Sequence, residues 1–321
     1  LSYGFLPKRL MSISNLIGTS ESYTFNMQAN VGLVSPFSGV SYGATNLLYS
    51  ITNSAGHTQM FWYIQPSPST TTGELVRASQ PYGGYIRWYY SDYTYTGSRI
   101  FREVSYRYLS KDGTTEQTYA IGRDPADVNR TTHFWADVHD YGALAQKVYW
   151  FGTIPGINIG LPIAHERRTY PNANTLLRQD FEWTQDALGN PFTWRVDTFL
   201  DPQGANQQIR VEQTLDARGN VIEVKKYKMR PYDPNSSPAL DRTYNNTYVT
   251  NAAYTNQEKW NLLSTATVTP AGGQTITLVT NTYDGTPEGF TGNEPGCPAS
   301  SLRNWVAPLG PAGNVTKRVT P

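Results

Sequence analysis

The sequence contains few cysteines and few charged residues, and each of these low counts excludes a class of protein. Cys297 is the only cysteine among the 321 residues, so no disulfide can form within the chain and the fold is not a disulfide scaffold. Charged residues make up 16%, and the formal net charge is only +1. Without a strong field of either sign, the chain lacks the electrostatic attraction that nucleic-acid binding or an anionic membrane surface would require.

Long hydrophobic runs are also missing from the sequence. No apolar stretch approaches the roughly 20 residues that a membrane-spanning helix needs. The chain begins at Leu1, and residues 1–16 lack the basic, apolar and small-residue order of a signal peptide. We expect that an export signal or longer leader has been removed and that the chain is part of a longer, secreted polypeptide.

Aromatic residues are abundant by contrast, and they indicate the fold class. They make up 13% of the chain and include 23 Tyr and 8 Trp. Aromatic and β-branched residues favour strands. We therefore predict an all-β fold of antiparallel hairpin meanders with very little helix. The best helix candidate is residues 136–148, where Asp140 could cap a short turn.

A repeat of turns marks the second half of the chain. Three turns place Asp three residues before Gly, and the three glycines lie 15 residues apart. Asp at the first position and Gly at the fourth are typical of a type I turn. We predict hairpin turns with positive φ at all three glycines. The predicted turn residues are Asp186, Gly189, Asp201, Gly204, Asp216, Gly219 and Asn220.

The segments between these turns alternate apolar and polar residues, as strands with one buried and one wet face do. The pattern predicts a four-stranded meander over residues 176–230. The residues expected to share a core are Phe192, Trp194, Val196, Ile209 and Val211. The residues expected to face water include Thr193, Arg195 and Asp197.

The first half contains a second meander, over residues 85–121, with a ribbon of aromatic residues at its start. Its candidate binding residues are Tyr85, Trp88, Tyr90 and Tyr93. Exposed rings of this kind could stack on sugars or on a partner chain, since they combine apolar area with polar tips. The alternative, which we favour, is that these rings fill a two-sided core.

A strand near the N-terminus is a candidate for assembly. Phe25, Met27, Val31 and Leu33 alternate with polar or small residues over 25–33. Such a strand could complete a neighbour's sheet, with backbone hydrogen bonds giving affinity and side chains giving register. The alternative is that it pairs with the chain's own meander.

Residues 214–227 resemble one YD repeat, in which Tyr-Asp, two residues and Gly-Asn precede an alternating strand ending in Tyr. Asp216, Gly219, Asn220 and Tyr227 fit that pattern, and Leu215 stands where it has Tyr. Gly313 begins what resembles the later half of another repeat. The chain thus resembles bacterial YD-repeat, or Rhs-type, surface proteins, best over 169–321.

This resemblance implies a spiral β-sheet that encloses a cavity or presents a surface for adhesion, although complete shells take many more repeats than this chain holds. We accordingly divide the chain into an aromatic-rich N-terminal β region, residues 1–168, and a YD-repeat-like hairpin region, residues 169–321.

Residues able to carry out chemistry are sparse. His133, Asp137 and His139 form the densest group of potential metal ligands. No second group with matching spacing accompanies them, so a polar turn beside aromatic packing is favoured over a metal site. Cys297 follows Gly296 without a supporting His motif. We expect no catalytic residue, no metal and no cofactor, although a triad assembled only in space stays open.

These observations favour a non-enzymatic structural module that self-associates through β-sheet edges as a surface assembly, wall or filament. The alternative is a glycan- or cell-surface-binding adhesion module. The expected partners are copies of the chain or the remainder of a longer polypeptide, with a glycan as a further option and nucleic acid excluded. The expected location is extracellular, at the bacterial cell surface.

Overall fold

The computed structural model describes residues 2–3, 9–18, 20–283 and 315–320, so Gly313 and Cys297 lie outside the described residues. The fold is all-β and antiparallel, as predicted. Helix in the described residues is limited to α1 (Ala252–Thr255) and two 3-10 turns, η1 (Thr96–Ser98) and η2 (Pro125–Asn129). No helix in this part of the chain has the length and apolar character needed to cross a membrane.

The chain divides into two units, which differ from the division expected at residue 168. The first comprises Leu1–Val148 with Arg168–Ala173, and the second comprises Tyr149–Arg167 with Asn174–Pro321. The earlier strands are β1 (Ser2–Tyr3), β2 (Leu10–Ser14), β3 (Ser22–Val34), β4 (Ser41–Asn53), β5 (Thr58–Tyr63), β6 (Thr70–Thr71), β7 (Leu75–Ser79), β8 (Tyr85–Tyr95), β9 (Arg99–Ser110), β10 (Glu116–Arg123), β11 (Trp135–Asp140) and β12 (Ala145–Phe151). The later strands are β13 (Pro162–Thr169), β14 (Thr175–Gln185), β15 (Pro191–Leu200), β16 (Gln207–Leu215), β17 (Val221–Tyr227), β18 (Arg230–Pro231), β19 (Leu240–Tyr248), β20 (Leu263–Pro270), β21 (Ile276–Tyr283) and β22 (Val315–Val319).

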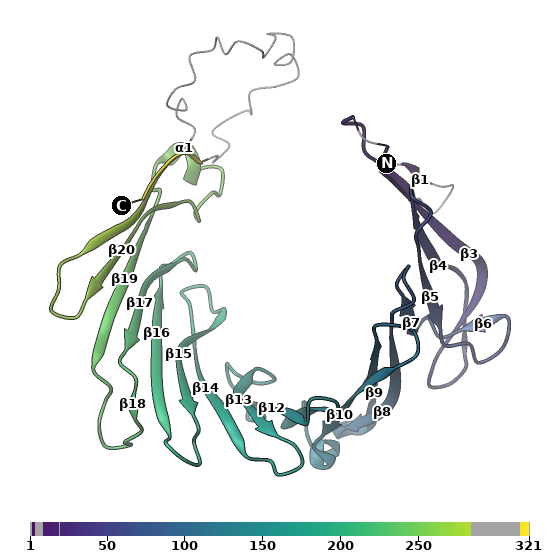
Figure 1. Ribbon diagram of the computed structural model, residues 1–321, viewed down its shortest axis with the longest axis horizontal. Coiled ribbons are helices and arrows are strands. Elements are labelled where there is room, and N and C mark those ends of the chain that lie inside the picture. The colour runs from purple at the N-terminus through teal and green to yellow at the C-terminus, as the bar shows by residue number, and fades with distance from the viewer. Residues whose placement is uncertain (1, 4–8, 19, 284–314, 321) are drawn as a thin grey trace, which may run out of the picture. The chain divides into compact units, whose positions relative to one another are not determined.

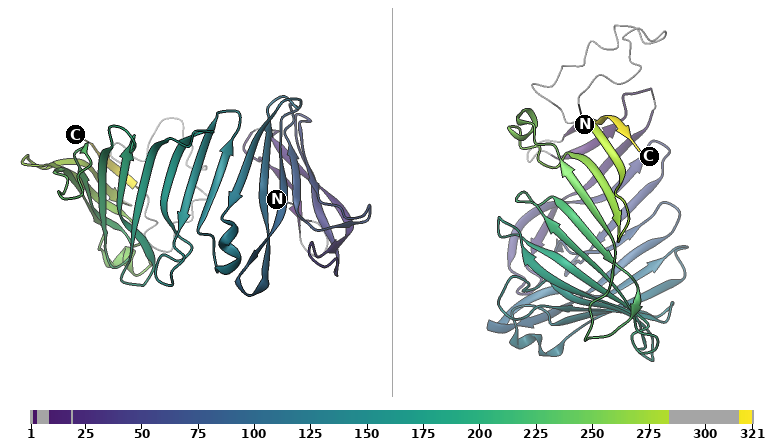
Figure 2. Two further views of the ribbon diagram at one scale, coloured as in Figure 1. Left: turned by 90° about the horizontal axis from the view of Figure 1, so that it is seen from below. Right: turned by 90° about the vertical axis from the view of Figure 1, so that its left-hand side faces the viewer.

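Each unit is a meander in which strands pair largely in chain order. In the first unit the antiparallel order runs β1, β2, β3, β4, β5, β7, β8, β9, β10 and β11, and β6 adds a short parallel pairing to β3. In the second unit the order runs β14, β15, β16, β17, β19, β20, β21 and β22. Figure 1 shows β14 to β17 side by side, and Figure 2 shows them as a single layer.

Two of the three repeated turns have the predicted geometry. Gly189 and Gly219 have φ of +85° and +82°. In each turn the first Asp closes the loop with its side chain: the Asp186 carboxylate accepts hydrogen bonds from the Leu188 and Asn190 backbone N–H groups at 2.9 and 2.8 Å. Asp216 accepts from Asn220 in the same way at 2.9 Å. The repeated sequence therefore encodes a repeated hairpin turn at these two positions.

The prediction of positive φ at Gly204 is wrong. The positive φ values of this loop fall on Asp201, at +47°, and Asn206, at +44°. The loop is wider, because the Asp201 carbonyl accepts hydrogen bonds from the N–H groups of both Gly204 and Asn206. A Cβ at position 204 would meet the Asp201 carboxylate, so a larger residue there would displace that side chain.

The Gly219 turn gives a testable consequence for stability. Gly219→Val should lower the free energy of unfolding by about 1–2 kcal/mol, because a β-branched residue is strained in the left-handed region. Gly219→Asn is the matched control, since Asn accepts this region at a smaller cost. Urea unfolding of both variants measures the difference, and an equal effect of the two would refute the turn assignment.

The helix considered for residues 136–148 is absent, and the prediction is wrong. These residues form β11, a turn in which Leu144 has φ of +49°, and the start of β12. Val138 pairs with Ile121 of β10, and His139 pairs with Ala120. Pairing with a strand distant in the sequence has overridden a weak local preference, which is the usual limit of helix propensity.

The expectation of one buried and one wet face in the second-unit meander is also wrong. Phe192, Trp194 and Val196 are only half-buried, whereas Asp197, expected in water, has 7% of its surface exposed. Across the described residues, seven apolar side chains are buried against twelve polar or charged ones. In the described residues this meander is a single layer of strands, so polar side chains that pair across strands are shielded as well as the apolar ones.

Candidate functional site

A polar cluster of the first unit lies where β8, β9 and β10 meet η2. Glu103 accepts hydrogen bonds from the Tyr95 hydroxyl at 2.7 Å and from Arg123 Nε at 2.8 Å. The His133 ring lies between two carboxylates, with Nε2 3.0 Å from Glu103 Oε2 and Nδ1 2.7 Å from Asp127 Oδ2. We call this set, Tyr95, Glu103, Arg123, Asp127 and His133, the Glu103 cluster.

The charges of the Glu103 cluster stabilise one another. Burial alone would raise the pKa of Glu103, but the hydrogen bonds from His133, Tyr95 and Arg123 outweigh it and lower the pKa to about 2. Burial would lower the pKa of His133, yet its hydrogen bonds to Glu103 and Asp127 raise it above the usual value. Burial, and then the bond to Glu103, raises the pKa of the Tyr95 hydroxyl.

The hydrogen bonds of the Glu103 cluster join side chains from several elements of the first unit. Every acid and base in it is bonded to another member, and Asp127 also accepts from the Phe134 backbone N–H at 3.0 Å. The hydrogen bonds of the Glu103 cluster therefore link β8, β9, β10 and η2 to one another.

The three candidate metal ligands do not converge. His139 Nε2 lies 2.8 Å from Asp137 Oδ2 on β11, as a shared strand face predicts, but His133 lies before β11 and belongs to the Glu103 cluster. Gln146 of β12 donates to the same Asp137 oxygen at 2.7 Å. No group of three or more His, Cys, Asp or Glu in the described residues is placed to hold a metal.

A second polar cluster, centred on Asp197, holds the repeat meander of the second unit. Arg210 forms two hydrogen bonds to the Asp197 carboxylate, from Nε at 2.8 Å and from an η nitrogen at 3.1 Å. Gln208 donates to it at 2.9 Å, and Arg195 Nε lies at 3.3 Å. Asp197 and Arg210 stand directly opposite each other on β15 and β16. The signal was present in the sequence as opposite charges at paired positions of a hairpin, but the alternation alone assigned these residues to water.

The structure does not bring the four ribbon residues together. Tyr85 is buried, with its hydroxyl bonded to Glu116 at 2.7 Å and the Arg77 guanidinium 3.8 Å from its ring centre. Along β8, Tyr85 and Tyr93 occupy one face while Trp88 and Tyr90 occupy the other, because successive side chains of a strand alternate. The Tyr90 hydroxyl donates to the Leu75 carbonyl at 2.8 Å.

The candidate assembly strand is paired within its own chain. Phe25 stands opposite Ile51 of β4, Val31 stands opposite Thr45, and Leu33 pairs with Thr71 of β6. Val31 is buried, and Phe25 and Met27 are half-buried. This strand therefore pairs within its own chain, which was the alternative to assembly. Any strand edge that pairs with a neighbouring molecule has to lie elsewhere.

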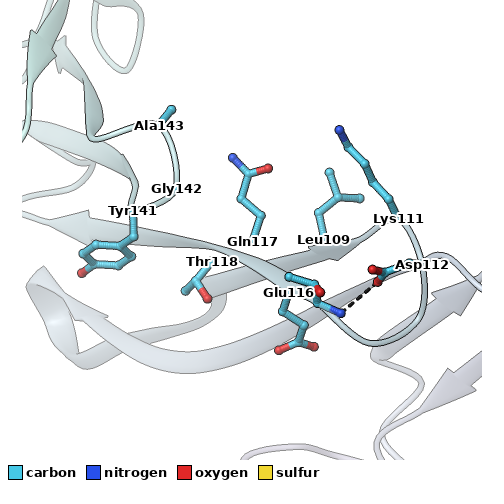
Figure 3. Close-up of a pocket in the computed structure, with 10 residues that line it drawn as sticks. Leu109, Lys111, Asp112, Glu116, Gln117, Thr118, Tyr141, Gly142 and Ala143 are labelled. Atoms are coloured by element: carbon cyan, nitrogen blue, oxygen red, sulfur yellow. Dashed lines mark hydrogen bonds between the residues drawn. The ribbon is translucent and has the colours of Figure 1, made fainter.

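A cavity of about 730 Å³ adjoins the β9–β10 hairpin. Figure 3 shows Leu109, Lys111 and Gln117 on one side of the strands that line it, with Tyr141 and Thr118 on the other. Gln117 Nε2 donates to the Asp140 carboxylate at 2.8 Å. The residues that line this cavity include Thr115, Thr118, Lys111, Asp112 and Glu116, and none of them is Ser, Cys or His. The sequence predicted a meander over residues 85–121 but not the cavity beside this hairpin.

No family model matches the chain, and no curated protein matches it. Among solved structures, one similar to this chain is "TcdB2-TccC3 without hypervariable C-terminal region", at 14% identity and a TM-score of 0.44, which covers 84% of this chain and 12% of that chain. The Photorhabdus luminescens Tc holotoxin pore is similar at 13% identity and a TM-score of 0.43, covering 83% of this chain and 14% of that one. A porin-like protein from Bacteroides uniformis has 10% identity and a TM-score of 0.29, covering 81% and 84%.

The chain thus spans about an eighth of the Tc toxin chains that it matches. Similarity at these values assigns no family and carries no argument about activity. The YD-repeat likeness stays a resemblance of turns and strands.

Proposed function

We propose that the chain is a non-enzymatic structural module, a length of β-sheet that is continued edge to edge by strands of a partner polypeptide. In the simplest case the partner is a second copy of the same chain. The resulting assembly would be a wall or filament outside the bacterial cell. The Tc toxin structures concern much longer chains, and what those proteins do is not transferred to this one.

The observation that carries this proposal is the pairing of the last strand of the second unit. Within the described residues, β22 pairs with β21 and with no further strand. An open strand edge presents a row of unpaired N–H and C=O groups, which a neighbour's strand can satisfy. In the first unit β1 likewise pairs only with β2 in the described part of the chain. Because these two edges differ, pairing one with the other would be head-to-tail, and such a contact extends as a filament unless the rotation between copies closes it into a ring.

Two further features support a structural role. The described residues include more buried polar or charged side chains than buried apolar ones, so additional strands or a covering partner would add apolar burial. The acids and bases of the two polar clusters bond mainly to one another. The proposed role is therefore structural and rests on these side chains, because a fold by itself does not decide function.

Sedimentation velocity over a concentration series tests the proposal with a charge placed on the open edge. Val319 of β22 is 50% exposed, and Val40, in the loop between β3 and β4, is 58% exposed, so Val319→Lys and Val40→Lys are a matched pair. Lysine on an edge strand opposes pairing. We expect the intact chain and Val40→Lys to associate at high micromolar concentration and Val319→Lys to associate less. Equal behaviour of the two variants, or an intact chain that stays monomeric throughout, would refute edge pairing through β22.

A further inference from the structure

We propose that the first unit carries a binding site for a neutral oligosaccharide in a trough between tyrosine side chains on one face of β9, β10 and β11. This inference goes beyond the structural role proposed above and does not depend on it. The residues of the tyrosine trough are Tyr106, Thr118, Ala120, His139, Tyr141 and Tyr170.

Strand register forms the trough. Ala120 of β10 stands directly opposite Tyr106 of β9 on one side and directly opposite His139 of β11 on the other. Thr118 follows two residues earlier on the same face, and its carbonyl accepts the Tyr141 backbone N–H at 3.3 Å. Side chains directly opposite one another share a face of the sheet. Small residues on the central strand β10 therefore lie between large rings on β9 and β11. The backbones of β9 and β11 are two strand spacings, or about 9.6 Å, apart.

The rings of both walls are held in place by their neighbours. On the β9 wall, Tyr106 and Tyr108 lie nearly parallel, with ring centres 6.1 Å apart. On the β11 wall, the Tyr170 ring meets His139 and Tyr141 edge-on, at 5.0 and 5.6 Å between centres. Such contacts add stability beyond the burial of area. Tyr106 and Tyr141 still leave 40% and 44% of their surface exposed, so the walls are both ordered and accessible.

The charged side chains beside the trough are paired with one another, which favours a neutral ligand. Arg87 binds both oxygens of Glu116, at 2.5 and 2.7 Å, and His139 is bonded to Asp137. Burial, and then the neighbouring Tyr170 and Tyr106, raises the pKa of Tyr141, so its hydroxyl stays protonated at neutral pH. The surface therefore offers flat apolar rings tipped with hydroxyls, and the charged groups named above are paired.

This chemistry suits a sugar better than a peptide strand. The C–H face of a pyranose packs against an aromatic ring while its hydroxyls bond to the polar tips. A peptide added as a strand would need an open backbone edge. β9 is already paired with β8 and β10, and β10 with β9 and β11.

Calorimetric titration of the intact chain with a panel of neutral hexasaccharides, namely cellohexaose, maltohexaose, chitohexaose and mannohexaose, tests the site. We expect at least one to bind with millimolar or tighter affinity. Tyr106→Ala removes one wall and Ala120→Tyr fills the floor, and each should weaken that binding at least about tenfold, or about 1.4 kcal/mol.

Tyr82→Ala is the matched control, because Tyr82 is 79% exposed in a hairpin where its ring contacts His57 instead of the trough. It should bind as the unaltered chain does. Far-UV circular dichroism checks that each variant is folded, and if Ala120→Tyr does not fold, the comparison of Tyr106→Ala with Tyr82→Ala decides the outcome. Absence of binding by the whole panel would overturn the proposal. Equal weakening by Tyr82→Ala and Tyr106→Ala would overturn it as well.

Discussion

Replacing Asp197 by Asn is expected to lower the free energy of unfolding by about 3 kcal/mol, because removing one partner of a buried ion pair leaves the other charge uncompensated. Asp197 has 9% of its side chain exposed and Arg210 has 18%, so water screens the attraction between their charges only weakly. Asn keeps the shape of the side chain and one acceptor oxygen. The lost stability therefore reports the charge, measured by urea unfolding near neutral pH.

An exposed pair in the same unit provides the control for Asp197→Asn. Asp241 lies 3.1 Å from Arg242, with 39% and 48% of the two side chains exposed. Surface ion pairs contribute little, so Asp241→Asn should cost less than about 0.5 kcal/mol. If the two substitutions cost the same, buried cross-strand charges do not stabilise the repeat meander, and the account of its polar face is wrong.

Replacing Glu103 by Gln should remove a pH-dependent part of the stability of the first unit. The pKa of Glu103 is about 2 in the folded chain, against an ordinary value of 4.5. A difference of about 2.5 units corresponds to roughly 3 kcal/mol. Because the folded-state pKa is lowered, this stability is fully present above the ordinary pKa and is lost as the pH falls toward about 2.

Chemical unfolding of the unaltered chain and of Glu103→Gln at a series of pH values measures this effect. The difference between them should be near 3 kcal/mol at about pH 6 and should shrink steadily between about pH 5 and pH 2. In the unaltered chain the pKa of His133 is raised, so its ring is protonated in both the folded and the unfolded state over that acidic window. A difference that stays constant across the window would show that Glu103 is not held ionised by its partners.

The fold class and much of the turn chemistry were predictable from the sequence. Asp186 with Gly189, and Asp216 with Gly219, specify their turns locally, through a side chain that bonds to the next few N–H groups and a glycine that accepts positive φ. Gly204 shows the limit of this reasoning. The same spacing of Asp and Gly closes a wider loop there, because Asn206 also bonds to the Asp201 carbonyl.

Burial and site geometry were not predictable, for a physical reason. Alternation identifies the residues that share a face, but not whether anything covers that face. The Asp197 carboxylate is shielded from water because Gln208 and Arg210, on the neighbouring strand β16, lie in register with it and donate hydrogen bonds to it. The tyrosine trough likewise needs three strands in register before Ala120 lies between two walls, and local sequence carries no sign of it.

The central claim, that an open strand edge pairs with another molecule, is tested most directly by amide hydrogen exchange across about a hundredfold range of concentration. The account predicts that amides of β22, residues 315–319, become more protected as concentration rises, while the turn at residues 186–190 exchanges equally throughout. Exchange in β22 that does not change with concentration would contradict the claim.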